Sequence, residues 1–164
     1  MIKNNNSIFP DYIVKKFKLW EDRYPANQKR SVIIPALHIL QDYNKGFLTI
    51  DLMNKLAQYL SISPVLVYEV ATFYSMYSTN KVGRHKVNVC TSISCMLKGS
   101  KSLIAGIEKK LNSPIGSTTV DQRITFNSVE CQGMCCAAPI LEIDKVFYEK
   151  ITPEKAIQLI DNLE

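Results

Sequence analysis

The sequence has no apolar run long enough to cross a membrane as a helix, which takes about 20 residues. The longest nearly uncharged stretch, residues 61–77, is interrupted by Pro64 and Glu69. The six glycines are scattered and form no Gly-x-Gly-x-x-Gly loop, so we expect no dinucleotide site on this chain. The first seven residues contain no arginine, and no apolar stretch follows them, which argues against a transit or signal peptide. These absences predict a cytoplasmic protein without direct membrane insertion.

A strong excess of one charge is also lacking. Twenty Lys and Arg against fifteen Asp and Glu give a net charge of +5, with no block of like charges, as on an ordinary solvated surface. Residues 53–72 could pass for a helix-turn-helix, but a recognition helix needs Arg, Lys, Asn or Gln to reach phosphates and base edges. Residues 64–78 contain none of these, and their one charge is Glu69. We therefore expect no nucleic-acid partner and interpret this half as a protein-docking element.

The first half of the chain is helical in pattern. Apolar residues at helical spacing, such as Ile13 and Phe17, predict one buried face for each helix. Ser31, Thr49 and Ser63 stand where N-cap residues are favoured. The predicted helices cover residues 11–24, 31–44, 49–60 and 63–77, and the predicted domain boundary lies within residues 78–83.

The second half alternates strands with helices. A strand, a helix and a second strand follow each other, so the two strands should run parallel through a crossover. Thr152 is a candidate cap for the last helix. The predicted strands are 85–89, 124–129, 140–143 and 146–148, and the predicted helices are 97–111 and 153–163. The chain is therefore expected to form a helical bundle over residues 1–82 and an α/β domain over residues 83–164.

Four of the five cysteines form two close pairs. Cys90 and Cys95 are separated by four residues, Cys131 and Cys135 by three, and 35 residues lie between the pairs. An odd count without a secretory leader argues against a disulfide framework. Four thiolates are the ligand count of an iron-sulfur cluster or of a structural zinc. The crossover would place Cys90 and Cys131 beyond the carboxyl ends of neighbouring parallel strands, where ligands tend to bind.

Spacing alone does not separate iron-sulfur from zinc. The uncharged loop of residues 131–139 suits backbone amides that point at cluster sulfurs, and Thr91, Ser92 and Ser94 can also donate to sulfur, which favours a cluster. Cys136 as a ligand would change the second interval, so we expect a buried non-ligand. A Cys-x-x-Cys motif is absent, which argues against a thiol oxidoreductase. His38 and His85 lie away from the cysteines, which argues against a Rieske centre.

Several motifs together are similar to one family. Residues 89–95 (VCTSISC), 118–121 (TTVD), 129–135 (VECQGMC) and 138–139 (AP) resemble, in order and spacing, the thioredoxin-like 2Fe-2S subunit of NADH:quinone oxidoreductase, respiratory complex I. The helical half agrees through residues 24–25 (YP), 35–38 (PALH) and 67–74 (VYEVATFY). The resemblance covers residues 11–164 and strengthens the iron-sulfur interpretation over zinc.

The resemblance implies one 2Fe-2S cluster held by Cys90, Cys95, Cys131 and Cys135. It implies an α+β fold class, in which an N-terminal helical bundle is followed by a thioredoxin-like α/β ferredoxin domain. The implied function is an oxidoreductase subunit that exchanges single electrons with the FMN of a flavin- and NADH-binding partner subunit. Hydride transfer would belong to that partner, and no residue of this chain would act as acid, base or nucleophile.

The family also implies further partners in the peripheral arm of the complex, which would hold the chain at the inner face of the membrane. The equivalent diaphorase subunit of an NAD-linked hydrogenase or formate dehydrogenase is the nearest alternative. A structural zinc protein or an iron-sulfur regulatory protein is a more distant one.

Overall fold

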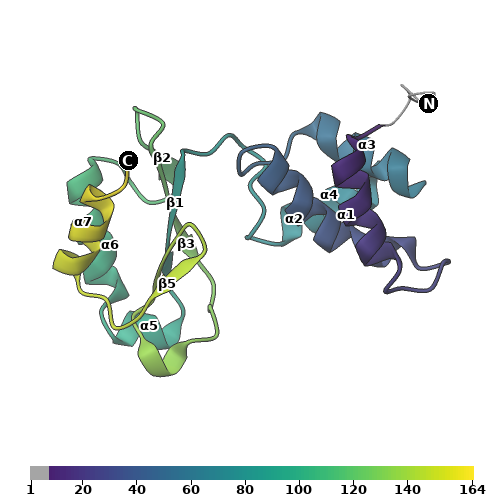
Figure 1. Ribbon diagram of the computed structural model, residues 1–164. Coiled ribbons are helices and arrows are strands. Elements are labelled where there is room, and N and C mark those ends of the chain that lie inside the picture. The colour runs from purple at the N-terminus through teal and green to yellow at the C-terminus, as the bar shows by residue number, and fades with distance from the viewer. Residues whose placement is uncertain (1–7) are drawn as a thin grey trace. The chain divides into compact units, whose positions relative to one another are not determined.

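The computed structural model describes residues 8–164, which fall into two compact units that meet between Lys81 and Val82 (Figure 1). Among these residues, no helix combines the length and the apolar character that a bilayer-spanning segment requires. The first unit contains α1 (Asp11–Glu21), the 3₁₀ turn η1 (Lys29–Val32), α2 (Ile33–Tyr43), α3 (Ile50–Leu60) and α4 (Pro64–Phe73).

Helix starts in the first unit follow the side chains that can cap them. The Thr49 hydroxyl accepts a hydrogen bond from the backbone N–H of Leu52 at 3.2 Å, so the predicted cap of α3 is confirmed. Ser63 precedes Pro64 at the start of α4 as predicted, although its side chain makes no cap hydrogen bond. The prediction for Ser31 was wrong, because this residue lies within η1 and α2 begins two residues later.

The fourth helix ends earlier than its apolar pattern predicts. α4 stops at Phe73, and the residues that follow make hydrogen bonds with α2 instead of continuing the helix. The buried Gln41 amide donates to the Met76 carbonyl at 3.1 Å and accepts from the Ser78 N–H at 2.7 Å. The Tyr77 hydroxyl donates to the Ile34 carbonyl at 2.9 Å. The Gln41 bonds satisfy one backbone carbonyl and one backbone N–H beyond the end of α4, and the Tyr77 bond fastens the same segment to α2.

The second unit is built on a five-stranded mixed sheet in the order β2-β3-β1-β4-β5. β1 and β3 pair in parallel with His85 opposite Ile124 and Cys90 opposite Val129, as the crossover predicts. The other neighbouring strands pair antiparallel. The elements are β1 (His85–Cys90), α5 (Ile93–Leu97), α6 (Ser100–Leu111), β2 (Ser117–Thr118), β3 (Ile124–Val129), the 3₁₀ turn η2 (Cys135–Ala137), β4 (Leu141–Ile143), β5 (Val146–Tyr148) and α7 (Pro153–Asp161).

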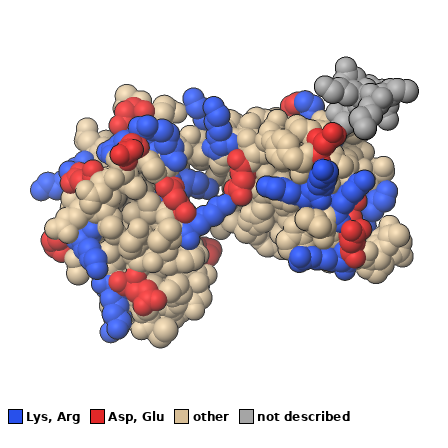
Figure 2. All heavy atoms as spheres, viewed as in Figure 1, with Lys and Arg blue, Asp and Glu red and all other residues tan. Residues whose placement is uncertain are grey.

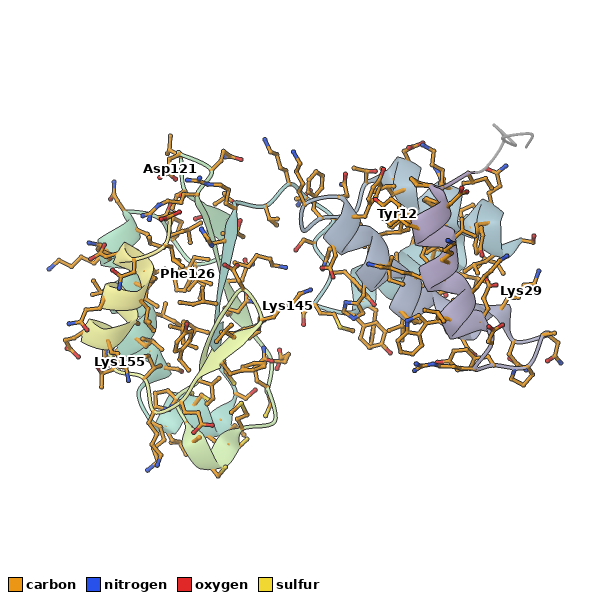
Figure 3. The ribbon with its side chains drawn as sticks, in the orientation of Figure 1. Tyr12, Lys29, Asp121, Phe126, Lys145 and Lys155 are labelled. Carbon is orange, nitrogen blue, oxygen red and sulfur yellow. The ribbon has the colours of Figure 1, made fainter. Side chains whose placement is uncertain are left out.

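The core of the second unit lies on one face of this sheet. α6 and α7 lie side by side on that face in Figure 1, and Phe126 points toward them in Figure 3. Alternate residues of the strands supply the buried side chains, as the period of two requires. The core residues are Val87, Val89, Leu103, Ile107, Ile124, Phe126, Leu141, Ile143, Ile151, Ala156 and Ile160. The intervening strand residues, among them Asn88 and Glu142, lie on the opposite face.

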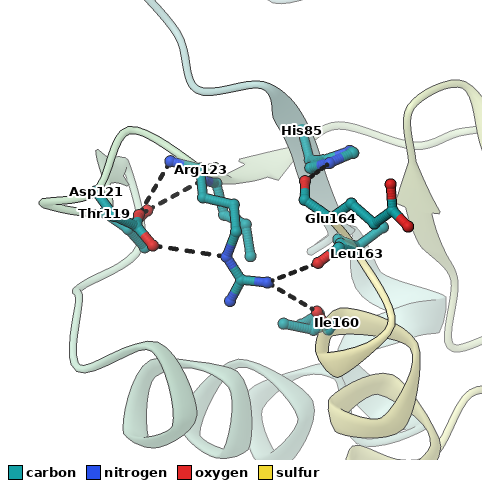
Figure 4. A network of polar contacts seen from close by, with 8 residues as sticks. His85, Thr119, Asp121, Arg123, Ile160, Leu163 and Glu164 are labelled. Atoms are coloured by element: carbon teal, nitrogen blue, oxygen red, sulfur yellow. Dashed lines mark hydrogen bonds and ion pairs between the residues drawn. The ribbon is translucent and has the colours of Figure 1, made fainter.

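Both ends of α7 are fixed by side chains. Thr152 accepts from the Lys155 N–H at 3.3 Å, which confirms the predicted cap. Beyond the C-terminal end, the Arg123 guanidinium donates to the carbonyl of Leu163 at 2.9 Å (Figure 4). A cation at this position satisfies terminal carbonyls and opposes the negative end of the helix dipole. The last helix is thereby fastened to the start of β3.

Candidate metal centre

The two cysteine loops leave the sheet at one edge. Cys90 is the last residue of β1, and Cys131 lies two residues beyond the end of β3. Because these strands are parallel and in register, both chains exit at their carboxyl ends. The first loop turns at once into α5, which carries Cys95. The second loop passes through Gly133 and enters η2 at Cys135.

Two of the thiols are buried and two are exposed. Cys90 and Cys95 each have 2% of their surface accessible and pack with Ala137 and Ile140. Cys131 and Cys135 are exposed, with their sulfur atoms 3.3 Å apart. The site therefore has a protected half from the first loop and an accessible half from the second.

Hydrogen bonds to sulfur connect the two loops. The Gly133 N–H donates to the Cys131 sulfur at 3.4 Å, within the second loop. Ser94 of the first loop hydrogen-bonds to the Cys135 thiol, so the serine predicted as a sulfur donor occupies that role. Thr91 does not, since its hydroxyl donates to the Val129 carbonyl at 3.4 Å. One amide and one hydroxyl thus stabilise negative charge on the second cysteine pair.

The thiols differ in how readily they ionise. Burial raises the pKa of Cys95, and a hydrogen bond with the Cys90 thiol raises it further. The backbone N–H of Gly133 lowers the pKa of Cys131, and the Cys135 thiol adds to this effect. The hydrogen bond between the Cys131 and Cys135 sulfur atoms, which lowers the pKa of Cys131, raises the pKa of Cys135. Cys131 is therefore the thiol of its pair that reaches the metal-binding thiolate form first.

The donor chemistry fits a group that takes thiolate ligands from two loops. Cys90 contacts Cys95 and Cys131 contacts Cys135, a pairing that suits two cysteine ligands on each of two irons. Gly133 has φ +78°, a conformation favoured by glycine, and it lets the loop turn so that its amide points at sulfur. Within residues 8–164, no three or more His, Cys, Asp or Glu side chains converge on a single ion-sized point.

The predicted burial of Cys136 was wrong. This cysteine is exposed. In a 3₁₀ turn successive side chains point about 120° apart. Ala137 is the member of η2 that turns into the protein, with 6% of its surface exposed, and Cys136 points to solvent.

The histidines lie elsewhere. His85 is the first residue of β1, at the end of that strand opposite Cys90, and its ring binds Asp144. His38 belongs to α2, where its ring lies 5.0 Å from that of Tyr77. Sequence reasoning missed the contact of Glu142 with the second cysteine loop, where its carboxylate accepts a hydrogen bond from Gln132 at 3.3 Å. No motif signals this contact, because it depends on strand register.

Known proteins resemble this chain over most of its length. Residues 17–164 match the family described as Thioredoxin-like [2Fe-2S] ferredoxin. An NADH-quinone oxidoreductase subunit from Rickettsia felis is 40% identical over 150 residues, which cover 90% of each chain. The mitochondrial NADH dehydrogenase [ubiquinone] flavoprotein 2 of Dictyostelium discoideum is 38% identical over 141 residues, which cover 86% of this chain and 57% of that protein.

A solved structure shares the fold at lower identity. An air-oxidized NAD+-reducing [NiFe]-hydrogenase matches 85% of this chain with a TM-score of 0.69 and 18% identity, and the match covers 24% of the hydrogenase chain. This likeness supports the α+β fold with helices ahead of a thioredoxin-like sheet. Since the family match includes both cysteine loops and most of the helical unit, the chain belongs to the thioredoxin-like [2Fe-2S] ferredoxin family.

Proposed function

We propose that this chain is the electron-transfer subunit of an NADH:quinone oxidoreductase, with one 2Fe-2S cluster held by Cys90, Cys95, Cys131 and Cys135. The observation that carries the proposal is that the two cysteine loops lie together at the carboxyl ends of β1 and β3, where Ser94 bonds to Cys135 and Ala137 packs on Cys90 and Cys95. A bound 2Fe-2S cluster accepts and releases one electron at a time. The relatives named as NADH-quinone oxidoreductase subunits support this parent complex over a hydrogenase, for which the likeness extends to the fold alone.

The residues around the thiols have separate tasks in this proposal. Ala137 and Ile140 keep water from Cys90 and Cys95, which lowers the polarity around one side of the cluster. The Gly133 amide and the Ser94 hydroxyl stabilise charge on Cys131 and Cys135, and such hydrogen bonds raise a cluster's reduction potential. The exposed second loop gives a partner an approach to the site.

Hydride chemistry would lie outside this chain. The sequence has no dinucleotide loop, so we propose that NADH and FMN bind to a flavoprotein partner that exchanges single electrons with the cluster. The helical unit is proposed to dock on that partner, and the peripheral arm would hold the chain at the inner membrane face. On the face that Figure 2 shows, basic and acidic side chains are interspersed, which supports a protein partner over nucleic acid.

The first test is elemental and spectroscopic. The full chain, purified without oxygen, should contain two irons and two sulfides and give an electron paramagnetic resonance signal after reduction, as one 2Fe-2S cluster requires. A colourless protein with one zinc per chain would replace the proposal with a structural zinc site. Reduction of the cluster by NADH should require the flavoprotein partner. Reduction of the isolated chain by NADH would contradict the assignment of hydride chemistry to that partner.

A further inference from the structure

One carboxylate on the sheet collects hydrogen bonds from two separate parts of the second unit. The Glu142 Oε2 atom accepts from the Asn88 side-chain amide at 3.2 Å and from the Gln132 side-chain amide at 3.3 Å. Asn88 is 8% exposed and stands directly opposite Glu142 in the pairing of β1 with β4. Both side chains therefore project from the same face of the sheet, opposite α6 and α7.

The two donors belong to the two halves of the cysteine site. Asn88 is two residues before Cys90 in β1, so both side chains leave the same face of that strand. Gln132 stands between Cys131 and Gly133, whose amide donates to the Cys131 sulfur. Glu142 therefore connects the strand that ends in Cys90 to the segment that presents Cys131.

Pairing of strands does not account for the Gln132 contact. Gln132 lies in a loop, outside β3 and before η2, so its hydrogen bond adds nothing to the backbone ladder of the sheet. Its loop is uncharged and turns through Gly133, around which a Cβ would meet no atom within 4 Å. The Gln132 hydrogen bond is therefore a side-chain contact that ties this loop directly to β4.

The charge of Glu142 is compensated on the sheet. The carboxylate attracts the Lys86 ammonium, which opposes the lowering of the Lys86 pKa by burial. Lys86, Asn88 and Cys90 alternate along one face of β1, so cation, amide and thiol stand in a row beside β4.

We propose that Glu142 and Gln132 are positioning residues for the metal centre. Their hydrogen bond holds residues 131–133 against β1 and β4, and this keeps the Cys131 thiolate and the Gly133 amide in the arrangement that binds the cluster. The inference rests on the proposed function, since it concerns the same four thiolates. Removal of such outer partners of metal ligands commonly weakens metal retention by about 10- to 100-fold.

The test measures how fast the full chain loses its cluster to an excess of an iron chelator under anaerobic conditions, followed by absorbance. Gln132→Leu removes the loop donor and Glu142→Leu removes the acceptor, so each should speed the loss about tenfold or more. The double variant should be no faster than Glu142→Leu, because that change already removes the acceptor of the Gln132 hydrogen bond, together with that of Asn88. Glu142→Gln keeps an acceptor oxygen for both amides and should stay within about threefold of the parent chain.

Two further readouts separate positioning from general destabilisation. The resonance spectrum of the reduced cluster should change in Gln132→Leu and Glu142→Leu and remain that of the parent in Glu142→Gln. Glu154→Gln, which removes a carboxylate at the start of α7, is the matched charge control and should leave both rate and spectrum unchanged. Thermal unfolding of each variant checks that the fold persists. Gln132 lies in a loop and is not among the buried core residues of the second unit, so its replacement should leave the core packing intact.

Failure of this inference can be distinguished from failure of the proposed function. A Gln132→Leu chain with parental loss rate and spectrum overturns the inference and leaves the proposed function intact. Rates that multiply in the double variant also overturn it, since the two side chains would then act separately. A parent chain that binds no cluster at all contradicts the proposed function instead.

Discussion

His85 and Asp144 form an ion pair, with 2.6 Å between Nδ1 and Oδ2, that joins the start of β1 to the turn between β4 and β5. The other ring nitrogen, Nε2, lies 2.8 Å from the Glu164 carbonyl oxygen. The hydrogen bond with Asp144 is the main cause that raises the pKa of His85 above its usual value. Because both neighbours are acceptors, the doubly protonated imidazolium satisfies both contacts.

This pair predicts a pH dependence of stability. With its pKa raised in the folded state, His85 contributes fully below its unfolded pKa, about 6.5, and the contribution is lost as pH rises through the folded pKa. The Asp144 side chain is 44% exposed, so we expect about 1 kcal/mol or less. Chemical unfolding of the parent and of His85→Gln should differ more at about pH 5.5 than at about pH 8.5. An equal difference at both values would contradict the charged pair.

Arg123 is predicted to stabilise the end of α7. Its guanidinium donates to the Leu163 carbonyl at 2.9 Å and lies 3.6 Å from the Asp121 carboxylate. Arg123→Ala leaves that carbonyl without its charged donor, which should cost about 1.5 to 3 kcal/mol in the free energy of unfolding. Hydrogen exchange should accelerate first at the α7 amides. Arg123→Lys, which keeps the charge, should recover part of the loss, and equal protection of α7 in all three chains would count against this role.

The caps of α3 and α4 offer a matched pair. The Thr49 side chain accepts the Leu52 N–H, whereas the Ser63 side chain makes no cap hydrogen bond. Thr49→Ala should therefore lower the free energy of unfolding by about 1 kcal/mol, and Ser63→Ala by clearly less. Trp20 fluorescence during denaturant unfolding reports on this unit. Equal losses in the two variants would show that the hydrogen bond is not what stabilises α3.

Phe126 is predicted to be a main support of the second unit. Its side chain is 0% exposed between the sheet and its two helices, and Val120 is 99% exposed. Phe126→Ala should cost about 3 to 5 kcal/mol, because it leaves a cavity in a closely packed core. Val120→Ala should change stability by no more than about 0.5 kcal/mol. Calorimetric unfolding of both variants checks the contrast, and a small loss for Phe126→Ala would mean that the core refills the space.

Neighbouring cysteines are predicted to differ in metal content. Cys135 lies 3.3 Å from Cys131 and bonds to Ser94, while Cys136 is exposed one residue further along η2. Cys135→Ser should greatly reduce iron per chain, and Cys136→Ser should retain it. Iron and sulfide analysis of the two purified variants decides this. Full iron in Cys135→Ser together with loss in Cys136→Ser would exchange their roles.

Local sequence predicted the elements whose signals are local. Thr49 and Thr152 were identified as caps because a hydroxyl three residues before its donor is a short-range pattern. The parallel pairing of β1 and β3 followed from strand, helix and strand in succession. The same reasoning found the edge of the sheet where the two cysteine loops lie.

Features that depend on distant partners were missed. The end of α4 at Phe73 reflects hydrogen bonds with Gln41, which is more than thirty residues away in sequence. α5 and β2 contain five and two residues, too few to show a period. The Gln132 contact with Glu142 requires the register of β4 against β1, which no composition or spacing reveals. Tertiary contacts decided each of these cases.

The in-register pairing of β1 with β3 has a consequence for how relatives of this chain can vary. The 35 residues between the cysteine pairs contain α6, β2 and β3, and an insertion in the connection at residues 112–116 lengthens that interval without moving either cysteine loop. An insertion within β1 or β3 would instead turn the following side chains to the wrong face. A genome-wide pattern search should therefore keep the two short cysteine intervals strict and leave the long one free.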